Sequence, residues 1–353
     1  MSLTMPVVEI SFRDIAQTAI SQRGQVVALI LAAAADEIPS ANPITIRMSS
    51  DIPAVVSDAN KTQIRNALIG GVSAPDKVIC YFKATTETAY TNAMTALERE
   101  TWDWLAIPDI GDDDADTIIE WLEDLRDAGQ YVKAVLPGVA ANKNFIVNFT
   151  TAGITVGSAT YTAKQYCSRI AGLIAGTPLS QSATYAELPE VSGVTKLSRA
   201  ERDTAVGNGE FIIFYDGEKV KTGRAVNSAT SGADDLKKIK LIEIMDTIRA
   251  QVSKKIEDDF IGKYPNTYDN KLVLVSALAT YFDSLAYAGI INTGYETGID
   301  VDAQAQYLRE HGISVVDMTE QEIREADTGS SVFIYAKIGI PDAIEDVYVA
   351  IQR

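Results

Sequence analysis

The sequence predicts an α/β N-terminal domain with a mostly parallel sheet and flanking helices, followed by an α+β C-terminal domain. In the first half, short apolar runs alternate with amphipathic segments of about a dozen residues, which is typical of a parallel sheet covered on both faces. After residue 195 this alternation gives way to a hairpin signal and long helices. Both chain ends hold strand-like segments that we expect to extend as arms. The predicted parts are 1–12 (N-terminal arm), 13–195, 196–342 and 343–353 (C-terminal arm).

The elements of the first domain begin with a buried strand, predicted by the apolar run VVALILA from Val26. A loop excursion over 36–59 contains a second strand candidate, ITIRM. A helix over 61–69 has Asp58 or Asn60 available as its N-cap and a pair of glycines as its stop. The other expected strands cover 77–83, 102–107, 131–136 and 144–149, and the other expected helices cover 87–98 and 114–127.

The stretch from Tyr161 to Val191 is predicted to start with a buried helix at the junction of the two domains. An apolar stripe recurs at helical spacing, and Gly176 followed by Pro178 ends the helix. One flank of this helix carries small residues, and Gly172 and Gly176 are four residues apart. In a soluble amphipathic helix this spacing predicts close packing against another segment.

The second domain is predicted to open with a hairpin over 210–226, because Asp216-Gly217 is a strong turn signal between apolar runs. A long helix is expected over 234–261, and its acidic start suits the positive end of a helix dipole. The other expected helices cover 270–288 and 302–311, and the expected strands cover 313–316, 331–340 and 347–351.

Composition excludes several classes of function. The formal net charge is −17 and neither half of the chain is basic, so a nucleic-acid surface is not expected and an anionic membrane would repel the protein. The longest apolar run, over 26–35, is about half the length needed to span a bilayer, and no signal peptide is recognised. Cys80 and Cys167 lie in apolar runs and are predicted to be buried thiols, as in a reducing cytosol.

Catalytic motifs are scarce in the sequence. His311 is the one histidine, so any serine or cysteine triad must use it, and its place at a helix end is a common structural one. Neither a phosphate-binding loop nor a dinucleotide fingerprint is present, and no cysteine and histidine set has zinc spacing.

An acidic cluster after the strand at 102–107 supports two readings. Asp109, Asp112 and Asp113 follow the carboxyl end of a strand, where open α/β sheets bind ligands, and their carboxylates suit Mg²⁺ or Ca²⁺. This reading predicts a metal-dependent hydrolase that uses the cluster over 109–114. The structural alternative is that these acids, with Asp114 and Asp116, occupy the start of the next helix.

Basic residues on the predicted 234–261 helix also support two readings. Lys237 and Lys238 lie near its start, and Lys254 and Lys255 lie about three-quarters of the way along it. They form either a solvated face or a docking strip for an acidic partner.

Several stretches together resemble the contractile tail sheath proteins of bacteriophages, defective prophages and phage-tail-like bacteriocins. They are AGLIAGTPLSQSATYAELPEV, GEFIIFYDGEKVKTGRAVNSATS, KKIKLIEIMDTIRAQVSKKIEDDFIGKYPNTYDNK and the ending IPDAIEDVYVAIQR, with ISFRDIAQTAISQRGQVVALIL near the start. The resemblance is densest from about residue 160 to the end. Many sheath proteins carry an added β-sandwich, for which this chain has no room.

The resemblance implies a structural protein that is not an enzyme and has no cofactor. Its copies are expected to form hexameric rings that stack as a helical sheath around a tail tube protein, with baseplate and tail terminator proteins as further partners. Neither nucleic acid nor direct membrane insertion is expected. The protein is expected in the virion tail sheath, made and assembled in the cytoplasm of the host bacterium. Its C-terminal half is expected to face the tube, and Lys237, Lys238, Lys254 and Lys255 are the tube-facing candidates.

The resemblance also implies that terminal arms add strands to sheets of neighbouring subunits. Carried onto this sequence, the arms cover 7–12 and 346–352, and the receiving sheet includes the 210–226 hairpin and residues 332–340. The residues support such arms independently, because a terminal strand with one apolar face needs an open sheet edge, in its own domain or in a neighbour. The apolar positions of the two arms are Val8, Ile10, Phe12, Val347, Val349 and Ile351.

Overall fold

The computed structural model describes residues 25–350, apart from the side chain of Asp112. The chain forms two compact units, which divide between Glu243 and Ile244. We call the unit that contains residues 25–243 and 343–350 the sheet unit, and the unit that contains 244–342 the helical unit. The sequence placed the boundary between 195 and 196, so the first unit is longer than predicted.

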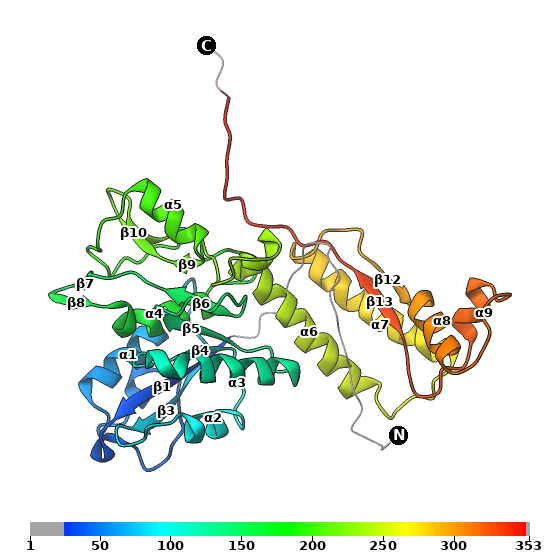
Figure 1. Ribbon diagram of the computed structural model, residues 1–353, viewed down its shortest axis with the longest axis horizontal. Coiled ribbons are helices and arrows are strands. Elements are labelled where there is room, and N and C mark those ends of the chain that lie inside the picture. The colour runs from blue at the N-terminus through cyan, green and yellow to red at the C-terminus, as the bar shows by residue number, and fades with distance from the viewer. Residues whose placement is uncertain (1–24, 351–353) are drawn as a thin grey trace. The chain divides into compact units, whose positions relative to one another are not determined.

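The sheet unit is built on seven strands in the order β2-β3-β1-β4-β5-β6-β9 (Figure 1). All neighbours are parallel except β2, which pairs antiparallel with β3 at one edge. This confirms the predicted mostly parallel sheet. The strands are β1 (Val26–Ala33), β2 (Ile44–Ile46), β3 (Lys77–Ala84), β4 (Trp104–Ala106), β5 (Lys133–Pro137), β6 (Ile146–Phe149) and β9 (Glu210–Phe211).

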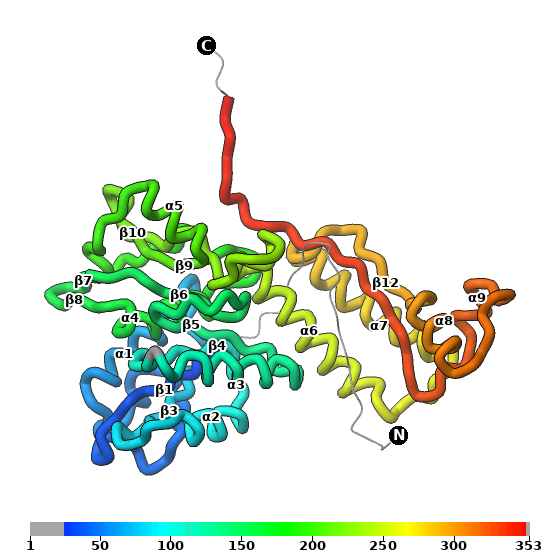
Figure 2. The backbone as a smooth tube through the Cα atoms, viewed as in Figure 1, coloured from blue at the N-terminus to red at the C-terminus, as the bar shows by residue number. Residues whose placement is uncertain are grey.

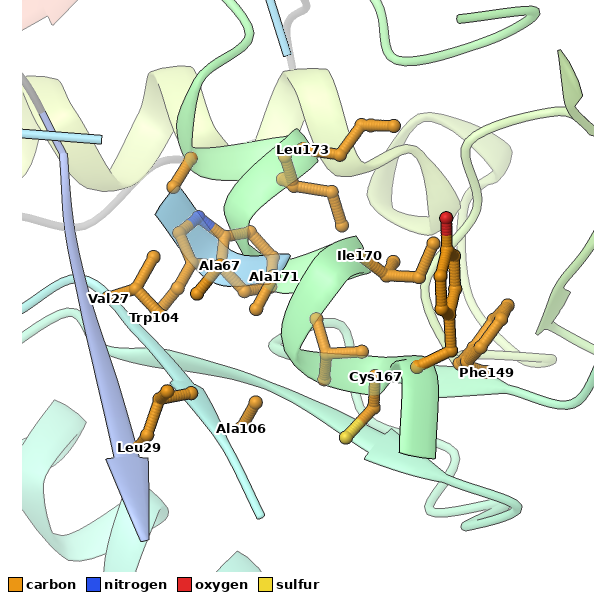
Figure 3. Packing of buried hydrophobic residues seen from close by; sticks show 14 of the residues in the cluster. Val27, Leu29, Ala67, Trp104, Ala106, Phe149, Cys167, Ile170, Ala171 and Leu173 are labelled. Carbon is orange, nitrogen blue, oxygen red and sulfur yellow. The ribbon is translucent and has the colours of Figure 1, made fainter. Parts of the chain in front are cut away.

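Helices cover both faces of this sheet, because the central strands are apolar on both sides. Alternate residues of β1 belong to two separate cores, with Leu29 in one and Ile30 in the other. The first core contains α1 (Asp58–Ile69) and α4 (Ala163–Ala175), and the second contains α2 (Thr91–Leu97) and α3 (Ala115–Asp127). Figure 3 shows part of the first core, with residues of β1, β4 and α4 gathered on one side of the sheet.

The helix predicted at the junction is α4, and ten of its residues are buried. The helix α4 packs closely against α1, because a Cβ added at Gly172 would lie only 2.1 Å from the carbonyl oxygen of Ala67. At Gly176 an added Cβ would lie 1.9 Å from the carbonyl oxygen of Ser73. The two glycines therefore let α4 approach α1 and the turn after it, as their spacing predicted.

Side chains at the helix starts fix the boundaries more sharply than the apolar pattern did. The N-cap of α1 is Ser57, whose Oγ accepts the Asn60 N–H, so the predicted caps Asp58 and Asn60 lie inside the first turn. Thr162 and Gln165 form a capping box at the start of α4.

The region after residue 195 continues the sheet unit, which explains the misplaced boundary. The short strand β9 pairs with β6 as the seventh strand, and α5 (Arg199–Gly207), which was not predicted, leads into it. The predicted hairpin forms as β10 (Ile213–Tyr215) and β11 (Val220–Thr222), and its side chains belong to the same core as α4. A second hairpin, β7 (Ile154–Val156) with β8 (Ala159–Tyr161), was also missed.

The predicted 234–261 helix is divided in two. A 3-10 turn, η4 (Asp234–Lys237), ends before α6 (Ile239–Asp259) begins, and the unit boundary lies within the first turns of α6. Glu243 of α6 makes a buried ion pair with Lys133 at 2.8 Å, and it also accepts a hydrogen bond from the side chain of Gln25. These bonds attach the start of α6 to the amino ends of strands β5 and β1.

The helical unit contains a pair of strands and three further helices. Its helices are α7 (Tyr268–Tyr287), α8 (Val301–Glu310) and α9 (Glu320–Glu325), and its strands are β12 (Glu296–Ile299) and β13 (Ile334–Lys337). The amine of Lys271 is buried and donates to the Gln304 amide oxygen at 3.3 Å and the Ala326 carbonyl at 3.0 Å. Residues 313–316 do not form the predicted strand; they follow α8 as a loop.

Among the described helices, none is both long enough and apolar enough to cross a bilayer.

Candidate functional site

The chain after β13 has neither helix nor strand up to residue 350, where the description ends (Figure 2, red). The side chains of Val347, Tyr348 and Val349 are 69%, 96% and 74% exposed. Since neighbouring residues that point to opposite sides are all exposed, this segment covers no sheet of its own chain within the described residues. The other predicted arm positions, Val8, Ile10, Phe12 and Ile351, lie outside the described residues.

Directly before this exposed segment, the side chain of Glu345 is buried, with 6% of its surface accessible. Its Oε1 accepts hydrogen bonds from Thr184 Oγ1 at 2.6 Å and from Ser182 Oγ at 3.3 Å. Its Oε2 lies 3.5 Å from Arg224 Nε and 3.4 Å from Lys238 Nζ. A buried carboxylate is tolerated when it is paired and hydrogen-bonded in this way. We call these five residues the clasp.

The receiving half of the clasp is held by bonds that do not involve Glu345. Thr184 Oγ1 accepts the backbone N–H of Ala225 at 3.0 Å, and the backbone N–H of Thr184 donates to Ser182 Oγ at 3.1 Å. Lys238 forms a β-bridge with Val226, two residues from Arg224. The hydroxyls and cations are therefore positioned by the sheet unit itself.

Arg224 also binds Asp346, the residue that follows Glu345. Its Nη2 donates to both carboxylate oxygens of Asp346 at 2.7 Å, and this hydrogen bond raises the pKa of the guanidinium. The same bond lowers the pKa of the Asp346 carboxyl. Because Asp346 is well exposed, its pair adds little stability and serves mainly to orient the segment.

The two segments predicted to receive an arm, the 210–226 hairpin and residues 332–340, differ in how much of their strand edges is already hydrogen-bonded within the chain. In the sheet unit, the outer side of β11 is bonded to residues 186–188: the Thr222 N–H donates to Ala186 and the Leu188 N–H to Val220. The amide of Ile213 in β10 donates to Thr151 Oγ1. The 210–226 hairpin is therefore covered by its own chain at these positions.

The β12–β13 pair of the helical unit is a sheet of two strands in the described part of the chain. The Asp300 N–H donates to the Phe333 carbonyl, and the register pairs Thr297 with Ala336. Bonded and non-bonded pairs alternate in an antiparallel ladder, so the N–H and C=O of Ala336 point away from β12. This edge can accept a further strand.

Each of the four predicted tube-facing lysines is paired with an acid of the same chain. The pairs are Lys237 with Asp234, Lys238 with Glu345, Lys254 with Asp258 and Lys255 with Asp259. Lys237 and Lys238 precede α6 and belong to the sheet unit, whereas the other two lie on α6 in the helical unit. The four lysines therefore do not share one helix face, which the sequence had suggested.

The acidic cluster lies in the turn that enters α3, as its structural reading predicted. Asp109 and Asp113 are exposed, and Asp114 ends the 3-10 turn η3 (Asp112–Asp114). No group of three or more His, Cys, Asp or Glu residues that could hold a metal ion occurs in the part of the chain that the structure describes. His311 follows α8, and its Nδ1 lies 2.8 Å from the Tyr307 carbonyl of that helix. The hydrolase alternative therefore gains no support.

Of the five clasp residues, the sequence singled out only Lys238, and for another role, as a tube-facing candidate. They are separated by more than a hundred positions, and each lies in a segment with an ordinary reading of its own. One signal was available: Glu345 and Asp346 form an acidic pair directly before an alternating apolar run.

Comparison with known families gives matches along most of the chain. The family model of the phage tail sheath protein central domain matches residues 83–228. The family model of the phage tail sheath C-terminal domain matches residues 231–353. The tail sheath protein of Clostridium phage phiCD119 is 32% identical over 356 residues, covering 98% of each chain.

Solved structures match at lower identity and show the fold. The sheath tail protein from Desulfitobacterium hafniense has a TM-score of 0.67 at 18% identity, covering 84% of this chain and 94% of its own. The helical sheath of the anti-feeding prophage in its contracted state has a TM-score of 0.70 at 13% identity, covering 100% of both chains.

Proposed function

Because this chain belongs to the phage tail sheath protein family, we propose that it is the repeating subunit of a contractile tail sheath. Its copies assemble into hexameric rings, stacked as a helical sheath around a tail tube. Contraction of the sheath drives the tube through a bacterial envelope. Assembly takes place in the cytoplasm of the host and joins the sheath to a baseplate and a tail terminator. This role needs neither catalysis nor a cofactor.

One observation carries the proposal: residues 347–349 form an exposed apolar segment, and within the described residues β12 and β13 form a two-stranded sheet with an open edge. Residues 347–353 of one copy add as a strand to the β12–β13 sheet of a neighbouring copy. Main-chain hydrogen bonds supply affinity and Val347 and Val349 supply apolar burial. A single arm binds weakly, but many arms in one lattice act together through their high effective concentration.

A truncation tests this directly. A chain that ends at Asp346 keeps the clasp and loses the arm, so we expect a folded subunit that forms no tubes under electron microscopy. A chain that ends at Ile351 removes two residues only and keeps the three apolar arm positions, so it is the matched control. Tubes formed by the chain that ends at Asp346 at the concentration that suffices for the full chain would disprove the arm mechanism.

The receiving edge is tested by Ala336→Pro, which removes the N–H that points away from β12. The partner ladder within the chain is kept, whereas an added strand loses one bond. Ala336→Thr keeps the N–H and is the control. Assembly that is equally efficient with both variants would place the receiving edge elsewhere.

The tube-facing surface includes Lys254 and Lys255, and Lys254 is 75% exposed despite its pair with Asp258. Reversing both charges to glutamate is expected to weaken co-sedimentation with tail tubes. Lys196→Glu, at an exposed lysine of the sheet unit, is the control. Lys237 and Lys238 stay candidates, but Lys238 is a poor test because its reversal also breaks the clasp. Docking that is unchanged by the double reversal would remove these two residues from the tube-facing surface.

A further inference from the structure

The place where the exposed C-terminal segment leaves the sheet unit is fixed by a built site. Glu345 is the last buried side chain before the segment, and residues 346–350 are all exposed. Four side chains from three separate stretches converge on its carboxylate: Ser182, Thr184, Arg224 and Lys238. Such convergence on one residue near a chain end is not required by the core of the sheet unit.

We propose that Glu345 is a positioning residue for assembly. Its carboxylate, bound by the receiving half of the clasp, fixes the point and direction from which the C-terminal arm reaches a second copy of this chain. The inference rests on the proposed function for its consequence in assembly. The clasp itself is a property of the single subunit. Pre-ordering the base of a flexible segment lowers the entropy that the segment loses when it binds.

The chemistry of the site favours a carboxylate at this position. Oε1 receives two hydroxyl hydrogen bonds, and Oε2 faces two cations at 3.4 and 3.5 Å. Glutamine keeps an oxygen acceptor for the hydroxyls but places no negative charge before Arg224 and Lys238. Alanine removes both. The two variants therefore separate the contribution of the charge from that of the whole contact.

The matched control is a second glutamate of the sheet unit whose ion pair lies on the surface. Glu187 pairs with Lys219, and its side chain is 55% exposed. Glu187→Gln removes the same charge from the same unit but touches neither the clasp nor the arm. Any general effect of net charge on assembly appears equally in this variant.

Arm position can be measured in the unassembled full-length subunit by electron–electron spin distance measurements. Labels are attached at Val349→Cys and Glu218→Cys, two exposed positions, while Cys80 and Cys167 are buried. We expect a narrow distance distribution in the unaltered clasp. Glu345→Ala should broaden it at least about twofold and Glu345→Gln should broaden it less, because the arm then samples many directions. Glu187→Gln should leave it unchanged.

Assembly is then measured as the lowest concentration that gives tubes. Glu345→Ala is expected to raise it about tenfold or more, with tenfold corresponding to 1.4 kcal/mol. Tryptophan emission checks that the sheet unit is folded, and Glu345→Gln supplies the answer if the alanine variant fails this check. An unchanged distance distribution, or a broadened one with unchanged assembly, overturns the inference. If the unaltered chain forms no tubes, the proposed function fails while the distances still decide whether Glu345 holds the arm.

Discussion

Replacing Gly172 by alanine tests how closely α4 and α1 must approach. The added Cβ would lie 2.1 Å from the Ala67 carbonyl oxygen and 2.8 Å from its carbonyl carbon. Ordinary van der Waals contact needs more than 3 Å, so the two helices must separate by about 1 Å. The obstructing atoms belong to the backbone of a helix and cannot rotate away.

The expected magnitude is the difference of two effects. Overpacking of a well-packed core costs about 1–3 kcal/mol, and a clash with main chain belongs at the upper end. Alanine is a better helix former than glycine by about 1 kcal/mol, which offsets part of this cost. We expect a net loss of about 2 kcal/mol in the free energy of unfolding. For a unit of this size that lowers Tm by about 4–8 °C.

The assay is thermal and urea unfolding followed by tryptophan emission. All three tryptophans, Trp102, Trp104 and Trp121, belong to the sheet unit, so the signal reports the unit that contains the substitution. The control is Gly207→Ala at the end of α5, where an added Cβ meets no atom within 4 Å. This control should be as stable as the unaltered protein or more stable. A Gly172→Ala protein that unfolds together with the control would refute the close-packing argument.

Three further predictions concern buried or partly buried groups. Burial alone would raise the pKa of Glu190, but the ion pair with Arg169 at 2.6 Å outweighs burial and holds this pKa below its ordinary value of 4.5. The stability that the pair contributes is therefore present above pH 4.5 and is lost as the pH falls below 4.5. The Glu190→Gln protein should show a smaller fall in Tm on acidification than the unaltered protein. Burial raises the pKa of Cys167 to about 12 and also raises that of Cys80, so both thiols should react with a thiol reagent only as fast as the protein opens; immediate labelling of either native thiol would contradict this. Lys133→Ala leaves Glu243 buried beside Gln25 without its cation and should destabilise the sheet unit by about 3–5 kcal/mol, measured by urea unfolding; a loss below 1 kcal/mol would show that water reaches Glu243.

The sheet was predictable because its strands are apolar on both faces and separated by amphipathic helices. The run from Val26 and the run from Lys77 became adjacent parallel strands, and Gly172 and Gly176 marked the close approach of α4. The predicted domain boundary at 195 differs from the observed one. The strand β9 that follows it is only two residues long, and a local sequence pattern cannot reveal which sheet such a short strand joins. The break between η4 and α6 was not predicted either, because the spacing of apolar residues continues across it.

The candidate site was predictable only in part. Alternation at Val347 and Val349 marked an apolar end segment, and its exposure fits that reading. The site that holds Glu345 depends on tertiary contacts, because Thr184 and Arg224 lie more than a hundred positions before Glu345 in the chain. Three of the lysine pairs have i,i+3 or i,i+4 spacing and could have been predicted from the sequence, whereas the pair of Lys238 with Glu345 depends on the tertiary fold.

The order of the units along the chain has a mechanical consequence. The chain leaves the sheet unit after Glu243 and returns to it at Ala343, so residues 244–342 are an insertion in that unit. A pulling force applied at the last residues first meets the bonds of Asp346 and Glu345 to the sheet unit, and while these bonds hold it bypasses the inserted ninety-nine residues. While the clasp holds, tension on the chain end therefore reaches the sheet unit before it reaches the β12–β13 pair of the same copy.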